Sequence, residues 1–145
     1  MFRGNHPARV DEKGRLKIPS DFKREVDECY GAQFFITSVD GERAQVWPMP
    51  EWQKMEKKVL DMPGVPAKKK WLDRTSYYGQ VAEMDAQGRV LIPQVLRESA
   101  NAVGEVVVFG KLNFLEVANH DQFRAKLEAE PMTAEDEAAL AELGL

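Results

Sequence analysis

One stretch of twelve residues occurs twice in this chain, and it constrains the fold more than any other feature of the sequence. Residues 8–19 read ARVDEKGRLKIP and residues 82–93 read AEMDAQGRVLIP, which gives six identical positions at a constant offset of 74. Several mismatches are chemically mild, such as Val10 with Met84. This degree of identity indicates an internal duplication, so we expect two similar halves.

Each copy contains the signature of a tight turn. Asp11 is followed three residues later by Gly14, and Asp85 is followed in the same way by Gly88. Aspartate at the first position of a turn accepts hydrogen bonds from the backbone that follows, and glycine tolerates the left-handed conformation that ends it. We therefore predict that these four residues support two equivalent turns.

Short alternating runs follow both turns. Leu16 and Ile18 alternate with Arg15 and Lys17, and the second copy repeats this pattern with Val90 and Ile92 opposed to Arg89 and Leu91. A period of two predicts a half-buried strand. Each copy is therefore expected to form a β-hairpin that projects an arginine just past its tip.

The rest of each half predicts a helix, a second hairpin and another helix, and the last hairpin is expected to pair residues 105–110 with residues 113–117. Pro19 and Pro93 end the hairpins and introduce helices, with Ser20 expected as the first N-cap. We divide the chain into residues 1–77, residues 78–130 and an acidic helical tail at 131–145. Because one pair of hairpins cannot bury a core alone, the halves are expected to share a single barrel-like sheet. Cys29 is expected to be a small buried residue.

Charge is distributed unevenly along the chain. The net charge of −4 hides a basic amino end, where residues 1–24 carry seven Lys or Arg against three acids, and an acidic end, where residues 125–145 carry six acids against one base. Such polarity is compatible with an anionic partner at the basic end. No apolar run is long enough for a membrane span or a signal peptide, so the cytoplasm is the expected location.

The residue types needed for common enzyme sites do not occur in suitable patterns. A paired-carboxylate protease would need Asp11 and Asp85 to converge, each usually followed by a small hydroxyl residue and glycine. Instead, an arginine stands near each aspartate, which favours anion binding. One cysteine and two histidines leave no Cys/His metal set, and no glycine-rich phosphate loop is present. We predict that the protein is not an enzyme and that it binds no cofactor and no metal.

The sequence resembles the MraZ family, within the superfamily of AbrB-like swapped-hairpin proteins. The resemblance covers about residues 1–125 and rests on four stretches: MFRG at the start, DEKGRLKIP at 11–19, PMPEW at 48–52 and GQVAEMDAQGRVLIPQVLR at 79–97. It implies an α+β fold. The duplicated halves would form a pseudo-twofold, double-psi-like barrel of swapped hairpins, with flanking helices. It also implies a transcriptional regulator that binds short direct repeats of double-stranded DNA upstream of the division and cell wall gene cluster, as a ring of several copies associated with the nucleoid.

Each candidate residue also has a plainer interpretation. Asp11 and Asp85 are explained by the turns alone, although they also stand where they can hold the adjacent arginine. Arg15 and Arg89 are not required by a hairpin, and an arginine at a rigid tip suits a bidentate contact with guanine or a contact with phosphate. Three other basic residues are predicted to neutralise phosphates, namely Arg3, Lys13 and Lys17. The run at Lys68–Lys70 is interpreted as a solvated helix face.

The sequence thus predicts a DNA-binding regulator, with Arg15 contributing more than Arg89 because more basic residues surround it. Two other classes remain open. A ring-shaped scaffold would use the same tips to bind an acidic protein, and a small barrel would bind a nucleotide or another small anion. The dependence of binding on salt separates the scaffold from the regulator, because the affinity for DNA falls steeply as salt rises.

Overall fold

Both copies of the repeated stretch fold as hairpins in the computed structural model, which describes residues 1–145. Each hairpin is followed by a helix, a second hairpin and further helices, as the duplication predicts. The elements are β1 (Asn5–Val10), β2 (Arg15–Lys17), α1 (Ser20–Cys29), β3 (Gln33–Thr37), β4 (Ala44–Pro48), α2 (Met49–Asp61), α3 (Pro66–Tyr77), β5 (Gln80–Glu83), β6 (Arg89–Leu91), α4 (Gln94–Ser99), β7 (Gly104–Gly110), β8 (Leu115–Asn119), α5 (His120–Ala129) and α6 (Ala134–Glu142).

The eight strands form one antiparallel sheet in the order β5-β3-β4-β8-β7-β1-β2-β6. The two end strands, β5 and β6, belong to the same hairpin. The backbone N–H of Asp85 donates to the carbonyl of Arg89 at 2.9 Å across its turn. The sheet therefore curls into a nearly closed barrel, which confirms the predicted α+β barrel and largely removes exposed sheet edges.

Strand pairing exchanges the first hairpins between the halves. β1 of the first half pairs with β7 of the second, and β5 of the second half pairs with β3 of the first. β2 pairs with β6 around the central register Leu16↔Val90, and β4 pairs with β8. Neither half could form this sheet by itself, so the two halves share one barrel in a swapped-hairpin arrangement.

The core follows the alternation seen in the sequence. Leu16, Ile18, Val90 and Ile92 are buried inside the barrel. Helices α1 and α4 cover it with three further buried side chains, namely Phe22, Val26 and Leu96. With Leu16 of β2 and Val90 of β6 directed inward, the residues that flank them in these strands face outward.

Three local predictions were wrong. Ser20 is the first helical residue of α1 and makes no cap, because Pro19 occupies the N-cap position. Cys29 is exposed at the last turn of α1 instead of buried. The last hairpin strand runs Leu115–Asn119 and not 113–117, because Leu112 takes a left-handed conformation (φ +71°) and widens the turn.

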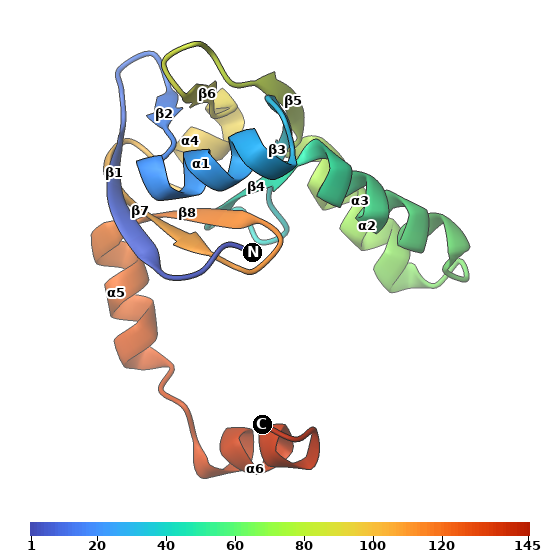
Figure 1. The fold of residues 1–145 in the computed structure, drawn as a ribbon. Coiled ribbons are helices and arrows are strands. Elements are labelled where there is room, and N and C mark those ends of the chain that lie inside the picture. The colour runs from blue at the N-terminus through green and yellow to red at the C-terminus, as the bar shows by residue number, and fades with distance from the viewer.

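The helices that follow each second hairpin lie at opposite sides of the barrel (Figure 1). Helices α2 and α3 project together as an antiparallel pair, whereas α5 lies alone on the barrel and α6 stands away from it. The turns that follow β1 and β5 lie at the end of the barrel remote from α5 and α6. The repeated hairpins and the acidic tail therefore occupy opposite ends of the molecule. No helix is both long and apolar enough to cross a membrane.

Candidate nucleic-acid interface

The first turn holds its arginine through one carboxylate. Asp11 Oδ1 accepts the backbone N–H of Lys13 at 3.0 Å and that of Arg15 at 2.8 Å. Its other oxygen, Oδ2, accepts Arg15 Nε at 2.8 Å. Gly14, at φ +85°, closes the turn by donating its N–H to the Asp11 carbonyl. Asp11 therefore both forms the turn and orients the guanidinium, which unites the two roles considered from the sequence.

The second turn repeats this geometry. Asp85 Oδ1 accepts the backbone N–H groups of Gln87 and Arg89, both at 2.9 Å, and Oδ2 accepts Arg89 Nε at 2.9 Å. Gly88 has φ +77°. In both copies only Nε is used within the chain, and the terminal Nη atoms of Arg15 and Arg89 make no hydrogen bond. Each arginine thus presents its free fork of donors from a fixed position, which lowers the entropy lost on binding.

Both carboxyl groups favour the ionised state. The N–H donated by the Arg15 backbone and the adjacent Arg15 guanidinium lower the pKa of Asp11 despite some desolvation. The corresponding backbone and side-chain bonds from Arg89 lower the pKa of Asp85. Hydrogen bonds to a carboxylate stabilise its charged form. At neutral pH both carboxylates are therefore ionised, and each forms an ion pair with its arginine.

This geometry predicts a loss of stability in acid. Because the folded-state pKa values of Asp11 and Asp85 lie below the unfolded value of about 3.9, their contribution is present above that pH and is lost as pH falls through the lowered values. The double variant Asp11→Asn/Asp85→Asn should show a smaller drop in urea midpoint between pH 7 and pH 3 than the unaltered protein. Some drop will persist, since the pKa values of Asp40 and Asp136 are lowered too. An unchanged drop in the urea midpoint would contradict the stabilising role of Asp11 and Asp85. The control is Asp121→Asn, at an almost fully exposed side chain.

The two arginines share one face of the β2–β6 ladder. In this register Arg15 is opposite Leu91 and Lys17 is opposite Arg89. All four side chains alternate with the buried Leu16 and Val90, so they face outward, on strands about 4.8 Å apart. The second half has Leu91, 53% exposed, where the first half has Lys17. This exchange, together with Lys13 where the second turn has Gln87, makes the first half the more basic side, as the sequence indicated.

Not all the predicted cations gather at this face. Lys13 is exposed within the first turn, next to Arg15. Arg3 precedes β1 at its other end, where the backbone of Phe2 and Leu112 is paired. With six residues of β1 between them, Arg3 lies on the order of 20 Å from the turn. The structure thus groups Arg15, Arg89, Lys17 and Lys13, and it places Arg3 apart.

Two further cations reach the turns, and neither was predicted from the sequence. The guanidinium of Arg97 from α4 packs directly over Gly14, so a Cβ added at that glycine would collide with it. The Lys23 side chain from α1 packs over Gly88 in the same way, 3.0 Å from such a Cβ. Arg97 Nε is buried and has no hydrogen-bond partner. The offset of 74 relates Lys23 to Arg97, so the repeat extends past the prolines to a basic residue in each helix, which is the sequence signal for this pair.

The contact between Gly14 and Arg97 predicts that a substitution at Gly14 will weaken DNA binding as well as the fold. Gly14→Ala should cost about 1–2 kcal/mol of unfolding free energy from left-handed strain, because the flexible Arg97 can swing aside. Gly31→Ala, at φ +90° with open space around it, should cost about the same. Only Gly14→Ala displaces a cation from the interface, so only that variant should lose DNA affinity. Equal affinities for the two variants, measured alongside urea denaturation, would contradict a role for this contact.

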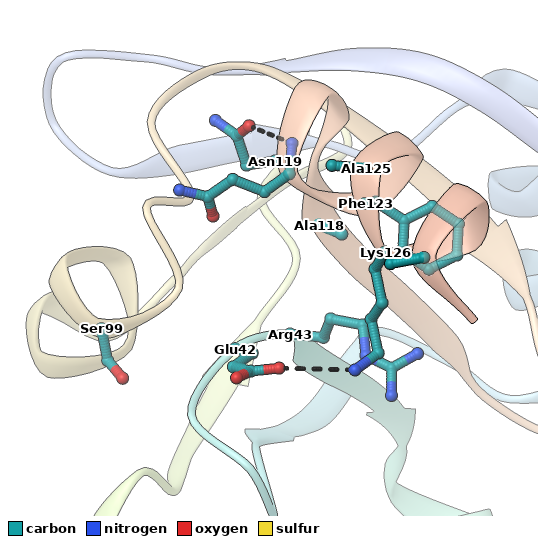
Figure 2. Close-up of a pocket in the computed structure, with 10 residues that line it drawn as sticks. Glu42, Arg43, Ser99, Ala118, Asn119, Phe123, Ala125 and Lys126 are labelled. Atoms are coloured by element: carbon teal, nitrogen blue, oxygen red, sulfur yellow. Dashed lines mark hydrogen bonds and ion pairs between the residues drawn. The ribbon is translucent and has the colours of Figure 1, made fainter.

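A hollow of about 450 Å³ lies elsewhere on the molecule, beside α5 (Figure 2). Glu42 and Lys126 face each other across it at 3.7 Å, and Ser99 lies at its edge. None of the cations at the two turns lines it. No group of three or more His, Cys, Asp or Glu side chains is placed to hold a metal ion. The duplicated turns are therefore the strongest candidate site.

The fold and the site together define a class, the duplicated swapped-hairpin barrels that carry an Asp-held arginine at each repeated turn. A sequence profile of the MraZ protein family, whose description adds "antitoxin-like", matches residues 1–75 and 80–143. This chain belongs to the MraZ family.

Curated relatives agree along the full length of the chain. It is 66% identical over 146 residues to a protein of Acidobacterium capsulatum and 50% identical over 147 residues to one of Koribacter versatilis, with both partners covered completely in each case. A protein of Halothermothrix orenii is 35% identical, again over the full length of both. All three are named transcriptional regulator MraZ.

Proposed function

We propose that this protein is a sequence-specific DNA-binding transcriptional regulator. The observation that carries this proposal is the pair of identical turns, each holding an arginine by Nε and leaving its Nη atoms free. A two-stranded β-ribbon fits the major groove, and an arginine fork pairs bidentately with guanine. The relatives named as regulators support the same function. Their name is that of a regulator and not of an enzyme, in agreement with the prediction of no catalysis.

The residues at the turns divide into two roles. Arg15 and Arg89 would contact base edges from the outward face of β2 and β6, with Arg15 dominant. Lys13 and Lys17 would neutralise phosphates beside them. Arg97 adds positive charge close to the first turn, whereas Lys23 over the second turn is ion-paired with Asp27 at 2.6 Å. Phosphate contacts supply affinity without reading sequence. Arg3, at the far end of β1, would reach phosphate only on DNA that extends past this face.

A single chain would discriminate poorly between sequences. Each good bidentate contact is worth about 1–3 kcal/mol, and one chain offers one or two. A closed ring of copies, joined head to tail, would place equivalent turns over consecutive short repeats. Linking the sites raises the effective concentration and multiplies the affinity. We therefore propose direct repeats upstream of the protein's own operon, in the division and cell wall gene cluster, as the target, with the protein located at the nucleoid in the cytoplasm.

The test is a binding titration with DNA taken from just upstream of the gene, compared with scrambled DNA of the same composition, over a range of salt. We expect tighter binding to the native sequence near physiological salt. A ring that makes 6–10 phosphate contacts should lose roughly 10³–10⁵ in affinity between 50 and 200 mM salt. Equal, weak binding to both DNAs would overturn the proposal and favour the alternative, a scaffold for an acidic protein.

A further inference from the structure

The first half closes the outer side of its barrel wall with a pair of helices. Trp52 of α2 stacks on Phe35 of β3, with ring centroids 4.6 Å apart, and on Trp71 of α3 at 5.6 Å. Thr75 of α3 is buried, and its carbonyl accepts the Thr37 hydroxyl at 2.7 Å. Helix α3 thus lies over the apolar surface that β3 and α2 present.

The second half presents the same surface without the covering helix. Phe109 stands where Phe35 does, at the offset of 74, and Phe123 is the fourth residue of α5 as Trp52 is of α2. Their rings are 4.6 Å apart. Beside them Leu127 is 59% exposed, and a hollow of about 420 Å³ is bounded by these three residues and Val107. We call this hollow the α5 groove.

The chain continues past α5 much as it continues past α2. Four residues, 62–65, connect α2 to α3, and four residues, 130–133, connect α5 to α6. Each connection contains a proline, at Pro63 and Pro131. The family match ends within α3 in the first half and at residue 143, just past α6, in the second. Helix α6 is therefore the counterpart of α3 and not an unrelated appendage.

Helix α6 buries none of its side chains where it stands. It has nine residues and a capping box formed by Thr133 and Asp136, but helices this short are marginal in water without tertiary contacts. Leu140 and Leu143 are three residues apart and so lie on one face. Leu140 lies as many residues after the 130–133 connection as Phe123 lies before it. In an antiparallel pair of helices, this equal spacing would bring the two side chains next to each other.

We propose that α6 folds back onto the α5 groove of its own chain, with Leu140 and Leu143 covering Phe123 and Leu127. Charge supports this occupant. Arg124 and His120 line the groove, and Lys111 lies over the Phe109 ring with its Nζ 5.7 Å from the centroid. Helix α6 carries only acids among its charged residues, which are Glu135, Asp136, Glu137 and Glu142.

Docking in the α5 groove would determine where the acidic side chains of α6 lie. The groove is also lined by Gly4, Asn5 and Gly110, at the ends of β1 and β7 remote from the repeated turns. The tail would therefore be held away from Arg15 and Arg89. It would not compete with DNA for them, and this inference does not depend on the proposed regulatory function.

Hydrogen exchange on the full-length protein tests the docking. We expect the backbone amides of α6 to exchange at least tenfold more slowly in the unaltered protein than in Leu140→Asp or Leu127→Asp, which place a charge on either side of the contact. Met62→Asp, at an exposed apolar residue of the other connection, should leave α6 protected. Protection of the barrel strands shows that each variant is folded. Equal, fast exchange of α6 in all four proteins would overturn the proposal.

Cross-linking then separates docking within a chain from docking between chains. Cys29→Ser removes the one natural cysteine. In that background, Leu127→Cys with Leu140→Cys should be joined by a short bis-maleimide into a product of single-chain mass. The pair Met62→Cys with Leu140→Cys should remain open. Products of two-chain mass from the first pair, or no product at all, would overturn docking within the chain.

Discussion

Replacing Arg15 with alanine is expected to abolish specific DNA binding while leaving the fold and the proposed ring intact. The guanidinium makes one contact within the chain, to Asp11, and its side chain is one-third exposed, so the barrel does not depend on it. Loss of one bidentate contact removes about 1–3 kcal/mol per chain. In the proposed ring, where several linked copies each lose it, the affinity for the native upstream DNA should fall by more than about a hundredfold.

Three further variants test the role of Arg15 more closely. Lys69→Ala removes the same charge from α3, away from the turns, and should change DNA affinity little. Arg15→Lys keeps the charge but not the fork, so binding to scrambled DNA should persist while the preference for the native sequence is lost. Arg89→Ala should have a smaller effect than Arg15→Ala. Retained affinity for the native DNA in Arg15→Ala, with an unchanged elution volume in size-exclusion chromatography, would contradict the assignment of Arg15.

The sequence predicted the features that local chemistry controls. The Asp11-x-x-Gly14 turn, the alternation around Leu16 and the helix start after Pro19 each depend on a few adjacent residues. Two equivalent hairpins and a shared barrel follow from the repeat. The boundaries were less accurate where a single backbone conformation decided them, as at Leu112 with its positive φ.

Contacts between distant segments could not be read from local pattern. Pairing of β1 with β7 joins residues such as Ala8 and Val106, and periodicity carries no information about which strand lies beside which. The same limitation hid Arg97 over Gly14 and allowed Arg3 to be grouped with the turns. Both errors arose because closeness in sequence was used where closeness in space mattered.

Replacing Trp52 with alanine is expected to be the most destabilising single change outside the barrel interior. Trp52 is 5% exposed and contacts three other aromatic rings, those of Phe35, Trp47 and Trp71. Removing a buried tryptophan costs about 3–5 kcal/mol, because the lost burial is joined by a cavity that its neighbours only partly fill. Domains are stable by about 5–15 kcal/mol, so the urea midpoint should fall by a large fraction.

The duplicated fold supplies the matched comparison for this change. Phe123, the counterpart of Trp52, is only partly buried and has a single ring partner, Phe109, at 4.6 Å. Even with Leu140 and Leu143 of α6 docked over it as proposed, Phe123 gains no second ring partner, so Phe123→Ala should cost about 1.5–3 kcal/mol, less than Trp52→Ala. Equal losses in the two variants, measured by urea denaturation under the same conditions, would contradict the larger contribution assigned to the three ring contacts of Trp52. A clear excess for Trp52 would locate the greater part of the peripheral stability in the α2–α3 pair.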